Sequence, residues 1–255
     1  MTSANRFGYE WEKYYWLSPD YEIQFQKWLG LFGLEIFQNK KVLDAGCGMG
    51  RNSFWALKYG AEELMAFDFD QRTVEAAKKN LAPFPNAQVE FASIYDINWQ
   101  DEFDVVFCIG VIHHLAQPRK AIEKLIDSAK SGGMVLIWVY GYEGNEWIVR
   151  FVSPWRKYLT SKLPLSLLHI LSYFFAFPLW LFVKLFKPKS PYLKQLSKFR
   201  FFHILSIVFD QLLPPIANYY KENEALELLT IHSRLRNIGI APCNQNSWTV
   251  YGYKI

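Results

Sequence analysis

The chain has 255 residues, of which 51% are hydrophobic, 18% aromatic and 20% charged. A chain of this composition buries a large core, which excludes global disorder. Its cysteines, Cys47, Cys108 and Cys243, are far apart and form no CxxC pair. This pattern argues against a disulfide framework and a zinc site, predicts no metal site and fits a reducing cytosol. The first sixteen residues lack the basic start and apolar run of a secretory signal, so we expect a cytoplasmic protein.

The net charge of +4 conceals a strong asymmetry along the chain. The stretch from Trp147 to Phe209 has ten Lys and Arg and no Asp or Glu, which leaves 18 basic and 24 acidic residues elsewhere. One basic segment therefore interrupts an acidic body, and this bears on partners more than on fold.

Residues 9–32 predict one or two helices, since Ser18 can cap a helix and Pro19 suits its first position. From Lys40 onward, short apolar runs alternate with amphipathic helical patterns. The predicted strands are 40–46, 63–70, 87–93, 103–110 and 134–141, and the predicted helices are 51–60, 71–80 and 118–133. This alternation predicts an α/β protein with a parallel sheet, helices on both faces and ligands at the carboxyl ends of the strands.

The alternation stops after Gly141. Residues 147–220 are apolar, aromatic and basic, and seven prolines predict their division into short helices. The pattern then returns with a helix over 222–239 and a strand over 247–255. We therefore expect an N-terminal helical cover (1–38), an α/β domain (39–146 and 221–255) and a helical cap insert (147–220).

A glycine loop follows the first strand in the stretch VLDAGCGMGR, residues 42–51. Its glycines are spaced G-x-G-x-G, and Arg51 stands where a dinucleotide loop has its third glycine. Asp44 beside this loop would repel a pyrophosphate and attract an ammonium or sulfonium group. Asp68, eighteen residues beyond Gly50, is placed to accept hydrogen bonds from ribose hydroxyls. These residues predict a nucleoside with a cationic appendage and disfavour an NAD-dependent oxidoreductase.

From about Lys40 to Gly141 the chain resembles the class I S-adenosylmethionine-dependent methyltransferases. VLDAGCGMGR matches the family's first motif, AFDFD its second-strand acid, and FDVVFCIGVIHHL its fourth-strand motif. The resemblance implies a Rossmann-like, doubly wound, mostly parallel seven-stranded sheet, S-adenosylmethionine as cofactor and methyl transfer as activity. It implies these cofactor contacts: Asp44, Gly46, Cys47, Gly48, Gly50, Ile109 and Gly110 for the methionine part, Asp68 for the ribose, and Phe69, Ser93 and Ile94 for the adenine. Ser93 and Ile94 replace an acid common in the family, so contact there would come from the Ser93 hydroxyl or the backbone.

His113 and His114 follow the fourth strand, where the family places residues that face the substrate. Histidine is the natural base for a nucleophile's proton near neutral pH, so one of the two is the expected catalytic residue. The alternative is that both only cap a helix or bond locally. The aromatic residues expected to wall the substrate pocket, unless they only pack, are Tyr140, Tyr142, Trp147, Tyr219 and Tyr220. The aromatic residues expected to cover the cofactor are Tyr9, Trp11 and Tyr15.

The insert contains the apolar run LPLSLLHILSYFFAFPLWLFVKLF, residues 163–186. The run is long enough to span a membrane, but Pro178, His169 and two serines make it a poor span. We expect either a helical cap over the substrate pocket or a cap that also rests on an anionic membrane through 147–209. Both predict an apolar or amphipathic acceptor, such as a quinone-like, polyketide or lipid-linked compound, and a place at the inner face of a membrane in the second case.

Two other functions remain open from the sequence. Nucleic acid is disfavoured, because the Asp/Asn-Pro-Pro-aromatic motif of base-amine methyltransferases is replaced by IGVIHH. A protein that binds S-adenosylmethionine without catalysis, as a partner or sensor subunit, is the alternative of another class.

Overall fold

The computed structural model describes residues 3–186 and 188–255, and its centre is a seven-stranded sheet in the order β3-β2-β1-β4-β5-β7-β6. The strands are β1 (Lys41–Ala45), β2 (Glu63–Asp68), β3 (Ala87–Phe91), β4 (Phe103–Ile109), β5 (Ala129–Tyr140), β6 (Leu235–Cys243) and β7 (Ser247–Lys254). The first five strands in this order pair in parallel, and β7 is antiparallel to both β5 and β6. The α/β class and the seven-stranded, mostly parallel sheet are as predicted.

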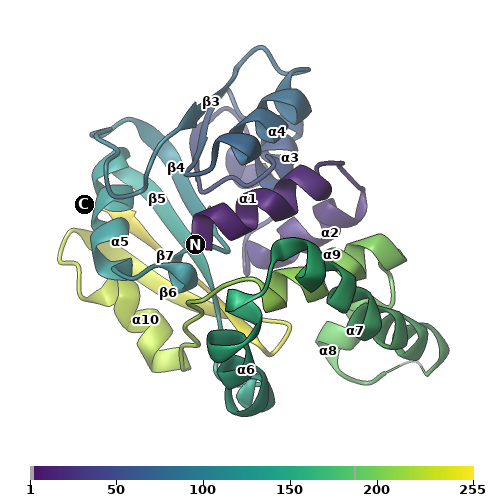
Figure 1. Cartoon of the computed structure of the whole chain (residues 1–255). Coiled ribbons are helices and arrows are strands. Elements are labelled where there is room, and N and C mark those ends of the chain that lie inside the picture. The colour runs from purple at the N-terminus through teal and green to yellow at the C-terminus, as the bar shows by residue number, and fades with distance from the viewer. Residues whose placement is uncertain (1–2, 187) are drawn as a thin grey trace.

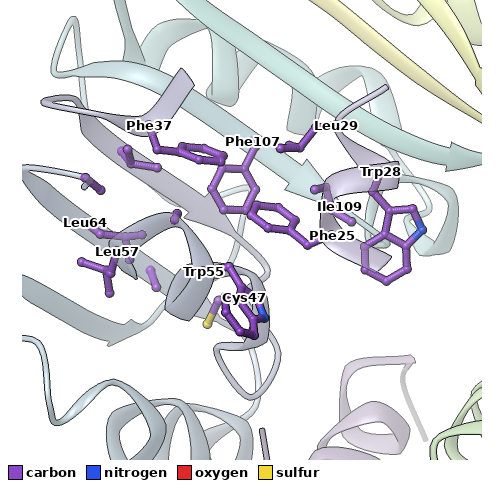
Figure 2. Close-up of a cluster of buried hydrophobic side chains, with 14 of the residues drawn as sticks. Phe25, Trp28, Leu29, Phe37, Cys47, Trp55, Leu57, Leu64, Phe107 and Ile109 are labelled. Carbon is purple, nitrogen blue, oxygen red and sulfur yellow. The ribbon is translucent and has the colours of Figure 1, made fainter. Parts of the chain in front are cut away.

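Helices cover both faces of this sheet (Figure 1). The helices of the α/β domain are α3 (Arg51–Lys58), α4 (Gln71–Leu81), α5 (Pro118–Ser128) and α10 (Glu222–Thr230), and α1 (Ser3–Lys13) and α2 (Asp20–Trp28) precede them. Because side chains alternate along a strand, Val42 packs in the core on the α2 and α3 side, and Leu43 packs in the core on the α5 and α10 side. Figure 2 shows the first core, where the rings of Phe25, Phe37 and Phe107 lie 5.6 Å apart.

Two helices are shorter in the structure than predicted from the sequence. The helix predicted over 118–133 ends at Ser128, because Ala129 already pairs with Phe103 of β4. The helix predicted over 222–239 ends at Thr230, and residues 235–243 form β6 instead. This strand lies at the sheet edge, has a register shift between Arg236 and Gly239 and contains Pro242. Edge strands tolerate bulges and proline. The sequence of β6 shows no clear alternation of apolar and polar residues, so it did not indicate a strand.

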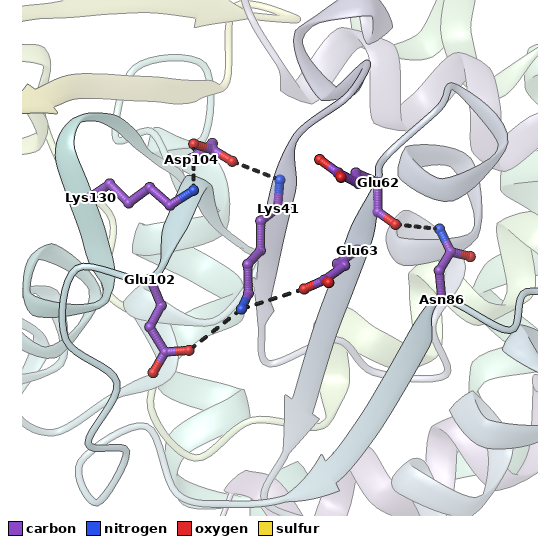
Figure 3. A network of polar contacts seen from close by, with 7 residues as sticks. All are labelled: Lys41, Glu62, Glu63, Asn86, Glu102, Asp104 and Lys130. Atoms are coloured by element: carbon purple, nitrogen blue, oxygen red, sulfur yellow. Dashed lines mark hydrogen bonds and ion pairs between the residues drawn. The ribbon is translucent and has the colours of Figure 1, made fainter.

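The amino-terminal edge of the sheet is held by polar contacts (Figure 3). The Lys41 ammonium pairs with Glu63 at 3.4 Å and with Glu102 at 3.7 Å, and the Asp104 carboxylate accepts hydrogen bonds from the Lys41 backbone N–H and the Lys130 ammonium. These groups are largely at the surface, so each pair contributes no more than about 1 kcal/mol. The cavity described below lies at the opposite, carboxyl edge.

The insert consists of several helices, of which the last lies beside α1 (Figure 1). They are the π-helical turn η3 (Ile148–Val152), α6 (Ser153–Tyr158), the 3-10 turn η4 (Thr160–Lys162), α7 (Leu165–Leu185), α8 (Pro191–Leu196) and α9 (Phe201–Leu212). The prediction that every proline divides the insert is wrong at Pro178, which lies inside α7. Packing of Leu168 and Ala176 before it, and of Val183 after it, against neighbouring helices holds both halves of α7 in line.

One buried arginine joins α1 to the insert. Arg6 is 1% exposed, and its guanidinium donates hydrogen bonds to the carbonyl oxygens of Thr160, Ser161, Leu163 and Leu213 at 2.7 to 3.4 Å. Since a buried charge is tolerated only when its donors are satisfied, this contact fixes α1 against the turn between α6 and α7 and against the end of α9.

Candidate functional site

A cavity of about 320 Å³ lies where the carboxyl ends of β1, β2 and β4 meet α1 and the insert. Its two parts have different chemistry. One part is lined by the glycine loop and by the residues after β2, β3 and β4. The other part is lined by side chains from α1, α2, the start of α3, α8, α9 and the end of β5.

The glycine loop presents bare backbone to the first part. Gly46 and Gly48 have φ of 77° and 57°, a left-handed conformation that glycine adopts without strain. A Cβ on Gly46 would lie 2.4 Å from the Val111 side chain, and one on Gly48 would lie 3.3 Å from the Trp11 ring. The N–H groups of Gly46 and Cys47 both donate to the Phe67 carbonyl at 2.9 Å, which fixes the loop against β2. Gly50 begins α3 and lies outside the cavity lining.

Asp68 and the residues beside it form the next portion of the wall. The Asp68 carboxylate accepts a hydrogen bond from the Gly48 N–H at 3.0 Å, and burial raises its pKa to about 6. Phe69 lines the cavity and stacks on Phe91 with ring centroids 5.4 Å apart. The Ser93 hydroxyl accepts a hydrogen bond from the Tyr95 N–H at 3.2 Å. Ile94, Ile109, Gly110 and Cys47 line the cavity as well.

Asp44 does not line the cavity, in contrast to its predicted contact with the methionine part. The two-residue period of β1 turns its side chain to the same face as Val42, toward α3. There the carboxylate is 1% exposed and accepts a 2.6 Å hydrogen bond from the Ser53 hydroxyl. Burial raises the pKa of Asp44 to about 7, so a share of this group is protonated at neutral pH. Cys47, which does line the cavity, has a thiol whose pKa is raised by burial, so it is a small filler there.

The structure separates the two candidate histidines. His114 lines the cavity, and its Nδ1 lies 2.8 Å from the Ile216 carbonyl oxygen. Since a carbonyl only accepts, Nδ1 carries the proton and the lone pair is on Nε2. Burial lowers the pKa of His114 to about 4, so the ring is neutral at pH 7. His113 is fully buried outside the lining, with its ring 3.8 Å from that of Tyr140.

Of the five aromatic residues predicted to wall the substrate pocket, two line the cavity. Tyr140 and Tyr219 line the cavity and stack with ring centroids 5.5 Å apart. The Tyr140 hydroxyl donates to Asp210 at 3.1 Å and accepts from the Gln211 amide at 3.0 Å. Tyr142 and Tyr220 line a separate, more open hollow instead, because the chain turns outward after β5. Trp147 is 60% exposed on the outer side of the insert.

The aromatic cover from α1 has one member in the lining. Trp11 lines the cavity, whereas Tyr9 packs beside Phe209 and Tyr15 is 55% exposed. The three are not one helical face: Tyr15 lies beyond the last residue of α1, and Tyr9 turns toward α9.

Three charged side chains that the sequence analysis did not assign meet in the second part of the cavity. Glu10 from α1, Arg51 from α3 and Asp210 from α9 all line it. The Arg51 guanidinium lies 4.7 to 5.3 Å from the ring centroids of Trp11, Tyr21 and Trp28.

The two acidic side chains are shielded from solvent, and this changes their pKa. Glu10 is 1% exposed, and burial together with the charge of Asp210 raises its pKa, while Arg51 opposes this shift. Asp210 is the first acid after the long basic stretch, which is the signal that could have singled it out. The amides of Gln24, Gln195 and Gln211 add further hydrogen-bonding groups to the lining.

The α/β domain is similar in sequence to known proteins. Residues 43–137 match the family model described as a methyltransferase domain. A tRNA U34 carboxymethyltransferase from Campylobacter hominis is 31% identical over 121 residues, covering 45% of this chain and 41% of that protein. The mitochondrial ubiquinone biosynthesis O-methyltransferase of Schizosaccharomyces pombe is 34% identical over 105 residues, covering 40% of this chain and 38% of that protein. The chain thus spans about two fifths of the length of these curated relatives.

Solved structures agree on the fold. The crystal structure of a SAM-dependent methyltransferase from Aquifex aeolicus covers 92% of this chain and 98% of its own, with a TM-score of 0.52 and 17% identity. This likeness extends beyond residues 43–137 and shows a shared fold over most of the chain.

Proposed function

We propose that this chain, which carries a class I S-adenosylmethionine-dependent methyltransferase domain, transfers a methyl group to an amphipathic small molecule held between α1, the insert and β5. One observation carries the proposal. A bare glycine loop and Asp68 share a single cavity with a neutral histidine whose tautomer is fixed.

The residues of the first part fit S-adenosylmethionine. The left-handed backbone at Gly46 and Gly48 accepts no Cβ without strain, so both positions remain bare backbone at the cavity wall, and Asp68 is placed to accept hydrogen bonds from ribose hydroxyls. Phe69 and Ile94 offer apolar surface to the adenine, and Ile109 and Gly110 border the methionine side. When bound, this cofactor supplies an activated methyl group on a cationic sulfur, and the protein supplies position and exclusion of water.

We assign His114 the role of general base. Its Nδ1–H is committed to the Ile216 carbonyl, which leaves the Nε2 lone pair to take the proton of an acceptor hydroxyl or amine. Because its pKa is about 4, the imidazole is unprotonated and ready at neutral pH. His113 shares none of this geometry, so it supports Tyr140 instead of acting on the acceptor.

The second part of the cavity favours an amphipathic acceptor over a wholly apolar one. Arg51 offers a guanidinium group and Glu10 and Asp210 offer carboxyl groups. Tyr140, Tyr219, Trp28 and Trp138 offer ring surface. An aromatic compound with hydroxyl or amino groups satisfies both kinds of contact. The ubiquinone biosynthesis O-methyltransferase among the relatives is consistent with such an acceptor.

Calorimetry with S-adenosylmethionine and S-adenosylhomocysteine tests the cofactor site. We expect wild type to bind both at tens of micromolar or better, and Asp68→Ala to bind at least about tenfold more weakly, as loss of a charged hydrogen-bond partner implies. The exposed Asp96→Ala variant is the matched control and should bind as wild type does. No binding by wild type would contradict the proposal.

Turnover is tested with S-adenosylmethionine labelled in its methyl group, incubated with a catechol, with an organic-solvent extract of cells and with bulk tRNA. We expect label in the catechol or in the organic phase. Label in tRNA alone would contradict a small-molecule acceptor and would indicate that the protein acts on tRNA, the molecule named for the carboxymethyltransferase relative. Cofactor binding without transfer of label to any fraction would identify a non-catalytic S-adenosylmethionine-binding protein.

A further inference from the structure

The outward face of α7 is apolar along its whole length. Residues spaced three or four apart form one stripe on this face, and their side chains are 41 to 71% exposed. They are Leu167, Ile170, Phe174, Phe177, Leu181 and Leu185. The opposite face, with Leu168, Ala176 and Val183, is buried. A soluble monomer rarely leaves so long an apolar surface in water, so this stripe marks an interaction surface.

The stretch of chain that contains the stripe carries charges of a single sign. Between Trp147 and Phe209 no acidic residue occurs. Eight basic side chains of this stretch are exposed: Arg150, Lys157, Lys162, Lys184, Lys189, Lys194, Lys198 and Arg200. An apolar stripe in a field of positive charge is complementary to an anionic lipid surface, which offers acyl chains to the first and phosphate groups to the second.

The same helices border the cavity from inside. α9 packs along α7, and Ser206, Asp210 and Gln211 of α9 line the cavity, as do Tyr192 and Gln195 of α8. A surface that contacted the α7 stripe would therefore lie one helix layer away from the second part of the cavity. An amphipathic acceptor dissolved in a membrane would then meet this part of the protein first.

We propose that the α7 stripe and its basic surround seat the protein on an anionic membrane surface, with α7 lying in the plane of the headgroups. This inference concerns location and does not require the proposed methyl transfer. A protein of the cytoplasm would meet such lipids on the inner face of a membrane.

Helix α7 meets the length and composition of a membrane span, with mean hydropathy of 1.8 and 22% of the window buried. The structure favours the in-plane position. Val183, near its carboxyl end, packs in a cluster with Leu196, Phe199 and Ile204, and Tyr14 of the N-terminal segment contacts His169 near its beginning at 2.9 Å. Crossing the bilayer would break both sets of contacts, so α7 stays with the body of the protein.

Co-sedimentation with vesicles tests the proposal on the full chain. We expect binding to vesicles of phosphatidylcholine and phosphatidylglycerol in equal parts, at least about tenfold weaker binding to phosphatidylcholine alone, and weakening by added salt. The double variant Phe174→Glu, Leu181→Glu should lose about tenfold or more in affinity for the anionic vesicles. The double variant Lys184→Gln, Lys189→Gln should lose about tenfold, since two basic groups near the surface are removed.

The control is Leu31→Glu, which charges a leucine 72% exposed outside the insert and should leave vesicle binding unchanged. Each variant must retain wild-type affinity for S-adenosylmethionine, which shows that it is folded independently of vesicle binding. Equal binding to neutral vesicles, or no binding by wild type, would overturn the proposal. Self-association through the stripe, seen by sedimentation velocity without any vesicle binding, would also overturn it. Resistance of bound protein to carbonate extraction would overturn it too, because it would indicate a membrane-spanning helix.

Discussion

The α/β domain and the insert distribute their polar and apolar side chains in opposite ways. In the α/β domain, β4 is almost wholly buried and the ion pairs of Lys41 lie at the rim of the sheet. In the insert, the outward face of α7 is apolar, while Arg156, Gln195 and Ser206 are buried on the inner side. The α/β domain thus presents polar side chains to solvent and apolar ones to its core. The insert presents apolar side chains outward and polar ones toward the inside.

This difference separates two tasks. The α/β domain holds the glycine loop and Asp68, whose positions depend on strand pairing between β1 and β2. The insert supplies Asp210 and Gln211, whose positions depend on helices joined to α1 by Arg6. Cofactor binding should therefore tolerate damage to the insert that abolishes acceptor binding.

The largest expected effect comes from His114, where the two regions meet. His114→Asn keeps an amide donor near the Nδ1 position for the Ile216 carbonyl and removes the Nε2 base, so we expect methyl transfer to a catechol to fall about 100-fold with cofactor affinity unchanged. Wild-type turnover should stay constant as the pH falls through 6.5 and decline only near 4, the pKa of His114. His232→Gln, outside the cavity lining, is the control. A decline centred at 6.5 would contradict the lowered pKa of His114, and an unaffected variant would contradict its role as base.

The next effect concerns the connection between the regions. Arg6→Met removes four hydrogen bonds to insert carbonyls, so we expect a loss of about 2 kcal/mol in the free energy of unfolding. Urea denaturation measures this loss, with the exposed Lys13→Met as control. Hydrogen exchange should rise at residues 160–163 and stay low in β1 and β4. Equal loss of protection in both regions would show that they unfold as one unit.

The smallest effect is the pH dependence of the insert's own stability. His203 is 5% exposed and stacks on Phe199 at 4.1 Å; burial and the charge of Arg51 lower its pKa to about 3, despite Asp20 at 3.9 Å. Because the unfolded chain binds the proton near pH 6.5 and the folded chain does not, His203 lowers stability as the pH falls from 6.5 toward 3.

The variant His203→Phe should remove this contribution, at most about 1.4 kcal/mol for each pH unit. Denaturation of wild type and variant at pH 6.5 and 5.5 measures it as the change in their difference. A difference that stays constant across this range would show that His203 is protonated in the fold.

Much of the α/β domain was predictable because its signals are local. The runs around Val42, Leu64 and Val106 are mostly apolar, as strands buried on both faces must be, and a glycine ends the first and the third. The N-cap of α4 is local in the same way, because the Asp70 carboxylate accepts a hydrogen bond from the Arg72 N–H only two residues ahead. By contrast, β6 was missed, because an edge strand with a bulge and a proline exists only through its pairing with β7.

The site divides in the same way. The sequence by itself determined the glycine loop, Asp68 and the histidine pair, because strand ends and turns fix their backbone within a few residues. Only the tertiary structure decided that Asp44 faces Ser53, that His114 and not His113 reaches the cavity, and that Glu10, Arg51 and Asp210 meet there. Those outcomes depend on which way a side chain points and on which distant segments meet, as when Glu10 and Asp210 line one cavity, and no local pattern encodes either.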